Sequence, residues 1–133
     1  MKQPIDLAHK FLAVADNDIK AFQKLAADAD IADASIGFHA QQVVEKCLKA
    51  VLALHSVKFQ KRHDLGELLD LYEKHHLPLP PMMEVLDELN PYAVTLRYDL
   101  FDDFEPLNRE RTKEIVLTIR RWADEQINGA RHS

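Results

Sequence analysis

The chain has 133 residues, of which 47% are hydrophobic and 29% are charged, and its formal net charge is −5. This length and balance are typical of one soluble domain with its own core, and the negative charge argues against a surface that coats nucleic acid. A single cysteine excludes an internal disulfide and a cysteine-cluster metal site, so we expect a cytoplasmic protein. No apolar run approaches the ~18 residues of a membrane span.

The first predicted helix covers residues 5–27. Its apolar residues recur at spacings of three and four, which places them on one helical face: Ala8, Leu12, Ala15, Ile19, Phe22 and Ala26. Pro4 precedes the helix, where its missing N–H costs little. After the helix, Asp33 and Ser35 are candidate N-caps for the next one.

The second predicted helix covers residues 34–55 and is apolar over nearly half of its circumference. The residues of this arc are Ile36, Ala40, Val43, Val44, Cys47, Leu48, Ala50, Val51, Leu52 and Leu54. Such a helix needs neighbours on several sides, so we expect it to be central. It also carries a polar row, His39, Gln42, Lys46 and Lys49, which would face solvent, a second copy of the chain or a ligand.

A short third helix is predicted over residues 63–76. Asp64 and Glu67 have the spacing of a capping box, in which the two side chains satisfy each other's free amides. Pro80 and Pro81 then prevent the helix from continuing.

Two further helices complete the prediction. One covers residues 82–98, where Pro91 should break or kink it after the preceding residue. The last covers residues 106–128 and is closed by Gly129. Because no strand pattern is present, we predict an all-α fold, an up-and-down bundle of four to five helices, in one domain over residues 1–133.

Three segments, in this order and spacing, resemble the HEPN domain family, whose name stands for higher eukaryotes and prokaryotes nucleotide-binding. They are FHAQQVVEKCLKAVL at 38–52, KRHDLGELL at 61–69 and LNPYAVTLRYD at 89–99. The resemblance covers nearly the whole chain. It implies a helical bundle that forms homodimers and that often works with a minimal nucleotidyltransferase encoded beside it, as in toxin–antitoxin pairs.

Many HEPN proteins similar to this chain are metal-independent ribonucleases, with an arginine separated from a histidine by four to six residues. Arg97 matches the arginine, but the positions of the histidine hold Asp102, Asp103 and Phe104. None of these can supply an imidazole for proton transfer beside a phosphate. We therefore expect a non-catalytic nucleotide-binding or partner-binding module. The alternatives are a ribonuclease whose proton transfer has moved to His63 or His39, and a purely structural dimerisation domain.

Seven residues are candidates for contact with a nucleotide such as ATP or GTP. They are Arg97, Tyr98, Lys46, Lys49, His63, Glu45 and Asp64. The guanidinium of Arg97 suits a pair of phosphate oxygens, whereas Lys46 offers a point charge. His63 stands at the start of the third helix, where free amides favour an anion.

Each candidate also has a structural interpretation that the sequence leaves open. Arg97 could form an ion pair with Asp64, Glu45 or the acidic segment 99–105, His63 could cap a helix, and Tyr98 could be a core residue. Whether RNA binds is equally open.

Other candidate sites are weaker. His75 and His76 are adjacent, so they point in different directions on a helix and do not form a metal pair; we expect no metal. Cys47 falls within the apolar arc, which favours a buried thiol over a nucleophile.

Overall fold

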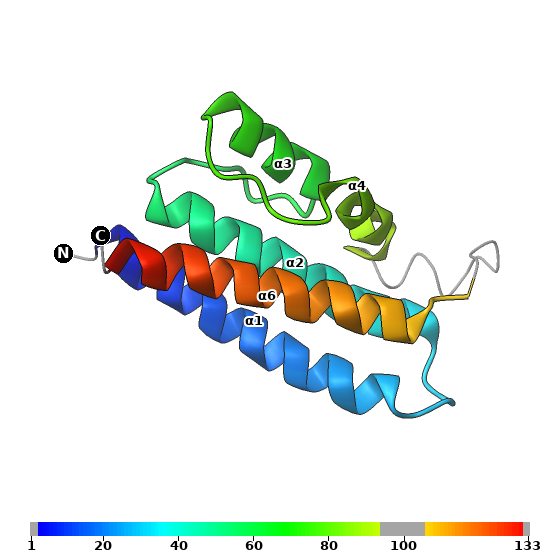
Figure 1. Cartoon of the computed structure of the whole chain (residues 1–133). Helices are drawn as coiled ribbons and strands as arrows, with labels where there is room; N and C mark the ends of the chain where they lie inside the picture. Colours follow the sequence, from blue (N-terminus) through cyan, green and yellow to red (C-terminus); the bar gives the residue numbers. More distant parts are fainter. Residues whose placement is uncertain (1–2, 94–105, 132–133) are drawn as a thin grey trace.

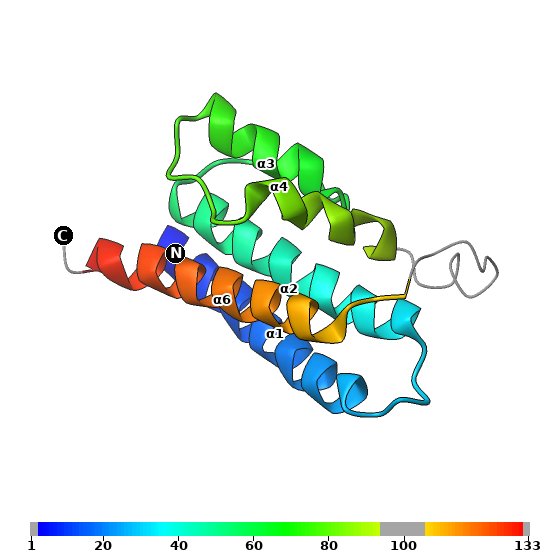
Figure 2. The same cartoon turned by 45° about the vertical axis from the view of Figure 1, so that its right-hand side comes forward.

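The central element of the computed structural model, which describes residues 3–93 and 106–131, is helix α2 (Asp33–Leu54). It contacts α1 (Pro4–Ala26), α3 (Leu65–Lys74), the 3₁₀ helix η1 (Asp87–Ala93) and α6 (Arg109–Arg131). Figures 1 and 2 show α1 and α6 on one side of α2 and α3 with α4 (Met83–Leu86) on the other. The part of the chain described contains helices and no strand, which confirms the predicted all-α bundle.

The three long helices, α1, α2 and α6, lie side by side. α1 runs opposite to α2, and α6 runs in the same direction as α2 (Figure 1). The arc predicted for α2 is buried along its length, apart from the partly exposed Leu54. The prediction that this helix is the central one is therefore confirmed.

The predicted N-cap of α2 is wrong. The helix is preceded by Ala32, which makes no side-chain cap, and Asp33 is its first residue. The Asp33 carboxylate accepts hydrogen bonds from the backbone N–H of Leu107 at 2.9 Å and from the Arg109 guanidinium at 3.2 Å. A charge-assisted contact of this kind is stronger than a local cap, so the carboxylate turns toward α6.

The predicted capping box of α3 forms only in part. Asp64 is the N-cap, and its side chain accepts from the backbone N–H of Gly66 and Glu67. The carboxylate of Glu67 instead lies 3.8 Å from Arg62, an exposed ion pair of small energetic weight.

The break in the fourth predicted helix occurs earlier than expected. The α-helical geometry ends at Leu86, and Asp87 begins the 3₁₀ helix that contains Pro91. Pro91 has no N–H to donate to the carbonyl four residues before it, which is that of Asp87, and its ring clashes with that group. The effect of the proline therefore reaches back one full turn. The end of the predicted helix, residues 94–98, lies outside the described residues.

Helix α6 begins and ends later than predicted. Asn108 accepts from the backbone N–H of Arg111 and Thr112 and so completes the first turn. Gly129 lies inside the helix, and a Cβ there would meet nothing within 4 Å. Because the helix continues to Arg131, Gly129 does not close it as predicted.

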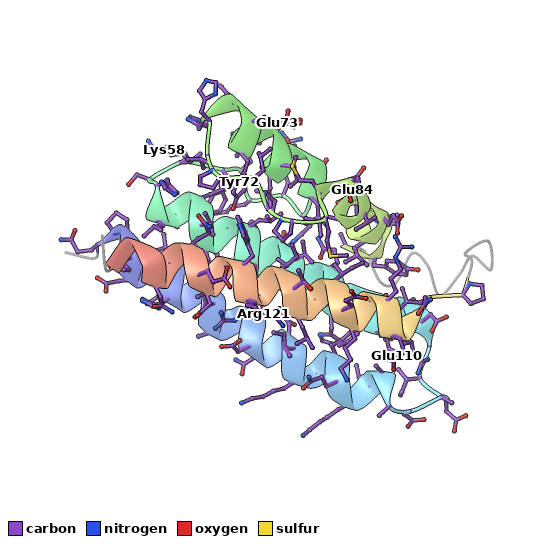
Figure 3. The ribbon with its side chains drawn as sticks, viewed as in Figure 1. Lys58, Tyr72, Glu73, Glu84, Glu110 and Arg121 are labelled. Atoms are coloured by element: carbon purple, nitrogen blue, oxygen red, sulfur yellow. The ribbon has the colours of Figure 1, made fainter. Side chains whose placement is uncertain are left out.

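Two contacts hold α3 and η1 against α2. The buried Tyr72, which lies between α3 and α2 (Figure 3), donates its hydroxyl to the backbone carbonyl of Leu48 at 2.6 Å. On η1, the ring of Tyr92 lies so close to Gly37 that a Cβ on that glycine would come within 2.4 Å of it. No helix among the described residues is both long and apolar enough to cross a membrane.

Candidate functional site

The polar row of α2 is covered over much of its length. Gln42 and Lys49 are only 8% and 6% exposed, and Lys46 is partly exposed. Over Lys49 and the neighbouring Glu45 the cover is the segment 55–64, whose Phe59 and His63 contact these side chains. Figures 1 and 2 show this segment turning at the end of α2 and running back between α2 and α3. Of the alternatives left open for the row, their burial excludes the solvent-facing one for Gln42 and Lys49.

Segment 55–64 rests on α2 through an aromatic ring and a histidine. The Phe59 ring lies 5.4 Å from Lys49 Nζ, within the range of a cation–π contact, and packs edge-on against Phe11 of α1. Four residues later His63 reaches Glu45, one helical turn before Lys49. The returning segment thus brings a ring and an imidazole onto the polar row.

Glu45 is the centre of a charged cluster. Its carboxylate is fully buried and lies 3.4 Å from Lys46 Nζ, 3.3 Å from Lys49 Nζ and 2.7 Å from His63 Nδ1. A buried carboxylate needs such partners, because removal of the charge from water is otherwise very costly. Two ammonium groups against one carboxylate leave an excess of one positive charge when His63 is neutral.

His63 is held in one orientation with one nitrogen outward. An ionised carboxylate can only accept hydrogen bonds, so Nδ1 carries the proton that is donated to Glu45. The His63 side chain is 54% exposed, and among the described residues its Nε2 has no hydrogen-bond partner. A fixed imidazole with a free Nε2 is an arrangement that can accept or donate a proton at that atom.

The free amides expected at the start of α3 are not free. The backbone N–H of Leu65 donates to the side-chain oxygen of Asn90 at 2.9 Å, and those of Gly66 and Glu67 donate to Asp64. Asn90 also donates from Nδ2 to Asp64 at 3.3 Å. The expectation that these amides favour an anion beside His63 is therefore wrong.

The sequence analysis did not identify Asn90, which holds the first residues of α3 beside His63. Its partner Asp64 is 26 residues away, so no local spacing relates the two. The available signal was its position directly before Pro91, where a helix break frees a polar side chain to bond elsewhere.

A second buried polar pair lies on α2 one turn before Glu45. Gln42 Nε2 donates to Gln41 Oε1 at 2.7 Å. The fully buried Gln41 leaves its own Nε2 without a partner in the described part of the chain. An unsatisfied buried donor costs about 1–3 kcal/mol, so this amide is a point where a bound acceptor would be stabilising.

The seven predicted site residues divide into three groups. The structure brings together four of them: Glu45, Lys46, Lys49 and His63. Asp64 adjoins this cluster as the cap of α3.

Arg97 and Tyr98 lie outside the described residues, so both interpretations of each remain predictions. His39 makes a separate pair with Asp18 of α1 at 3.1 Å. It lies six residues before Glu45, which is about 9 Å along the helix.

Two other features were weighed as sites. Cys47 is buried, as predicted; burial, partly offset by the nearby charge of Arg120, raises the pKa of its thiol to about 12. Within the described ranges, no three His, Cys, Asp or Glu side chains come together as a metal-binding group.

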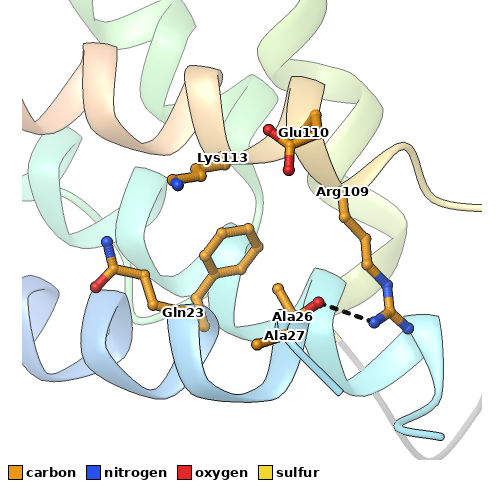
Figure 4. A pocket seen from close by; sticks show the side chains of 7 residues that line it. Gln23, Ala26, Ala27, Arg109, Glu110 and Lys113 are labelled. Atoms are coloured by element: carbon orange, nitrogen blue, oxygen red, sulfur yellow. Dashed lines mark hydrogen bonds between the residues drawn. The ribbon is translucent and has the colours of Figure 1, made fainter. Parts of the chain in front are cut away.

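A hollow of about 240 Å³ lies between α1 and α6 (Figure 4). Its lining includes Gln23, Arg109 and Lys113. The Arg109 guanidinium already donates to Asp33 and to the backbone carbonyls of Ala26, Asp28 and Ile31. This arginine ties α6 to the α1–α2 connection and has little capacity left for a ligand.

The chain was compared with known proteins in three ways. A family model described as HEPN domain matches residues 8–126, a range that includes the whole Glu45 cluster. Neither the search of curated proteins nor the search of solved structures found a match.

Proposed function

This chain belongs to the HEPN domain family, and on that premise we propose that it binds a nucleotide, such as ATP or GTP, without cleaving RNA. We also propose that it acts as a homodimer together with a minimal nucleotidyltransferase, as in toxin–antitoxin pairs. We expect the phosphates of the nucleotide to bind at the cluster formed by Glu45, Lys46, Lys49 and His63.

The absence of ribonuclease activity is supported by the residues that follow Arg97. In the ribonucleases of the family an arginine steadies the phosphate while a histidine moves the proton. Asp102, Asp103 and Phe104 occupy the histidine's possible positions here. A carboxylate at that place would repel the phosphate, and a phenyl ring cannot transfer a proton.

Nucleotide binding is carried by one observation, the excess positive charge around Glu45. The chain as a whole is negatively charged, with a net charge of −5. Yet Glu45 is flanked by two lysines and by an imidazole that is half exposed. Local positive charge next to an accessible donor or acceptor is what an anionic ligand requires.

A ligand screen tests the proposal. The purified chain is titrated calorimetrically with ATP and GTP, its thermal unfolding is followed in their presence, and the same sample is incubated with labelled RNA. We expect stabilisation of about 2.7 kcal/mol at a ligand concentration of one hundred times Kd, with the RNA intact. Absence of any nucleotide binding would leave a dimerisation domain as the better account.

A second function, ribonuclease activity through a different histidine, is favoured by one specific observation. The hydrogen bond from His63 to the buried Glu45 orients an imidazole in the way that acid–base catalysis uses. Cleavage of the labelled RNA by the wild-type chain, and its loss in His63→Gln, would establish this function and refute the non-catalytic proposal.

The assembly has its own test. We expect the mass measured by light scattering to be that of a dimer, and a nucleotidyltransferase encoded next to this chain to co-purify with it. A monomeric mass, or separation of the two proteins on co-expression, would refute this part of the proposal.

A further inference from the structure

The geometry points to Lys46 and His63 as the subsite for a terminal phosphate, in which the phosphate and His63 Nε2 share one proton. This inference rests on the proposed nucleotide binding. It adds that the terminal phosphate contacts Lys46 and His63 and that the affinity for the nucleotide depends on pH.

The first step identifies the cations that can reach a ligand. Lys49 is 6% exposed and is enclosed between Glu45 and the Phe59 ring, so it balances the buried carboxylate. The side chain of Lys46 is 18% exposed, and its Nζ makes a long contact of 3.4 Å with Glu45. Lys46 can therefore turn toward a ligand while Lys49 keeps the carboxylate neutralised.

The neighbouring arginine is less suitable. Arg62 donates to Gln60 at 2.7 Å and lies 3.8 Å from Glu67, and its side chain is well exposed to water. Its charge is therefore partly balanced and screened. The excess positive charge of the site is carried by Lys46.

The second step concerns the proton on His63. Because the N–H of Nδ1 donates to Glu45, the other nitrogen of the neutral ring, Nε2, has no proton. Its lone pair repels an anion. The protonated ring presents an N–H donor in the same direction, and Glu45 stabilises the resulting positive charge. Binding of an anion at Nε2 therefore requires a proton between the anion and this nitrogen.

The charges around His63 permit this change. His63 faces Glu45 of α2, which also contacts Lys46 and Lys49, and the next residue along the chain is Asp64, the N-cap of α3. The Asp64 carboxylate is engaged by the first amides of α3 and, from η1, by the uncharged Asn90. Among the residues that the structure describes, Glu45 is thus the charged group in direct contact with the imidazole.

The third step identifies the ligand group. A terminal phosphate and an imidazole are groups of similar intrinsic proton affinity, with reference pKa values of about 6 and 6.5. When they meet, one proton taken from solvent is held between phosphate oxygen and Nε2. A carboxylate, with a pKa of about 4, shares a proton with imidazole much less evenly. The site therefore suits a phosphate monoester or the last phosphate of a nucleoside polyphosphate.

The experiment measures the proton directly. ATP is titrated into the full chain at pH 8 in buffers with different ionisation enthalpies, which gives the number of protons taken up, and Kd is then followed from pH 6 to pH 8. We expect uptake close to one proton and an affinity that falls by up to about tenfold per pH unit. Adenosine, which lacks the phosphates, should bind at least about tenfold more weakly than ATP.

Three variants complete the test. His63→Gln should abolish the proton uptake and flatten the dependence on pH. Lys46→Met should weaken ATP binding by about tenfold and leave the uptake unchanged. The His63 side chain is the most exposed of the three, at 54%, so His63→Gln is the variant most certain to fold. His39→Gln is the matched control, since His39 is also an imidazole on α2 paired with a carboxylate, that of Asp18; it should behave as the wild type.

The outcomes separate the two proposals. If the wild type binds neither ATP nor GTP, the proposed function fails and this inference fails with it. If ATP binds without proton uptake, or if His63→Gln keeps the uptake, nucleotide binding stands and the His63 subsite is refuted. Equal affinity for ATP and adenosine would also refute a phosphate subsite.

Discussion

The replacement of Glu45 by glutamine tests the charged cluster most sharply. Glutamine keeps the shape of the side chain and an oxygen that can accept from His63, but it removes the negative charge. Among the described residues, Lys49, at 6% exposure, would then retain the Phe59 ring but no charged partner. Removal of one partner of a buried ion pair costs about 3–5 kcal/mol. The Phe59 contact is present in both proteins and does not change this cost, but the glutamine oxygen that remains can still accept from Lys49 and places the loss near the lower end of the range.

We therefore expect Glu45→Gln to lower the free energy of unfolding by about 3 kcal/mol, measured by urea denaturation followed by circular dichroism. Lys49→Met placed in the Glu45→Gln background should recover most of the loss, because it removes the unpaired charge. The double-mutant cycle should give a coupling energy above about 1 kcal/mol. A loss below about 1 kcal/mol for Glu45→Gln, or additive effects in the cycle, would show that the cluster is not an interdependent buried unit.

Three further predictions concern other parts of the fold. Arg109→Lys should cost about 2–3 kcal/mol in urea denaturation, because one ammonium cannot replace a guanidinium that donates to a carboxylate and three carbonyls; wild-type stability would contradict this. Gly37→Ala should cost about 1–3 kcal/mol and shift the ring resonances of Tyr92, since the new Cβ would lie 2.4 Å from that ring; unchanged resonances would count against the close packing. Burial raises the pKa of the Cys47 thiol from 9.0 to about 12, so the thiol should resist iodoacetamide at pH 8 until the protein is unfolded. Above pH 9 the unfolded state loses this proton while the folded state keeps it, so stability should fall by up to about 1.4 kcal/mol per pH unit as the pH approaches 12; Cys47→Ala should remove this part of the slope and leave the part due to Tyr72, whose pKa burial also raises.

The long helices could be predicted because their apolar periodicity is strong and local. α1 and α2 begin and end within about two residues of the predicted positions, which is the usual scatter of helix boundaries. The ends that were wrong depend on distant contacts. Asp33 failed as a cap because its partner Arg109 lies 76 residues further along the chain.

The candidate site could be predicted only as a set of residue types. Glu45 and Lys49 were both candidates, and their spacing of one helical turn permits the ion pair that the structure shows at 3.3 Å, but the pair itself was not predicted. That segment 55–64 would cover Glu45 and Lys49 was not predictable, because the path of an irregular segment depends on where Phe59 and His63 find partners. The structure alone shows that His63 bonds to Glu45 across 18 residues of sequence.

The measurement that tests the central claim most directly is a calorimetric titration of ATP into the wild-type chain and into Lys46→Met under identical conditions. The account predicts saturable binding to the wild type and an affinity about tenfold lower for the variant, which is the loss expected for one charge-assisted contact. Equal affinities would show that the nucleotide binds away from the Glu45 cluster, and the absence of binding to the wild type would contradict the proposed function itself.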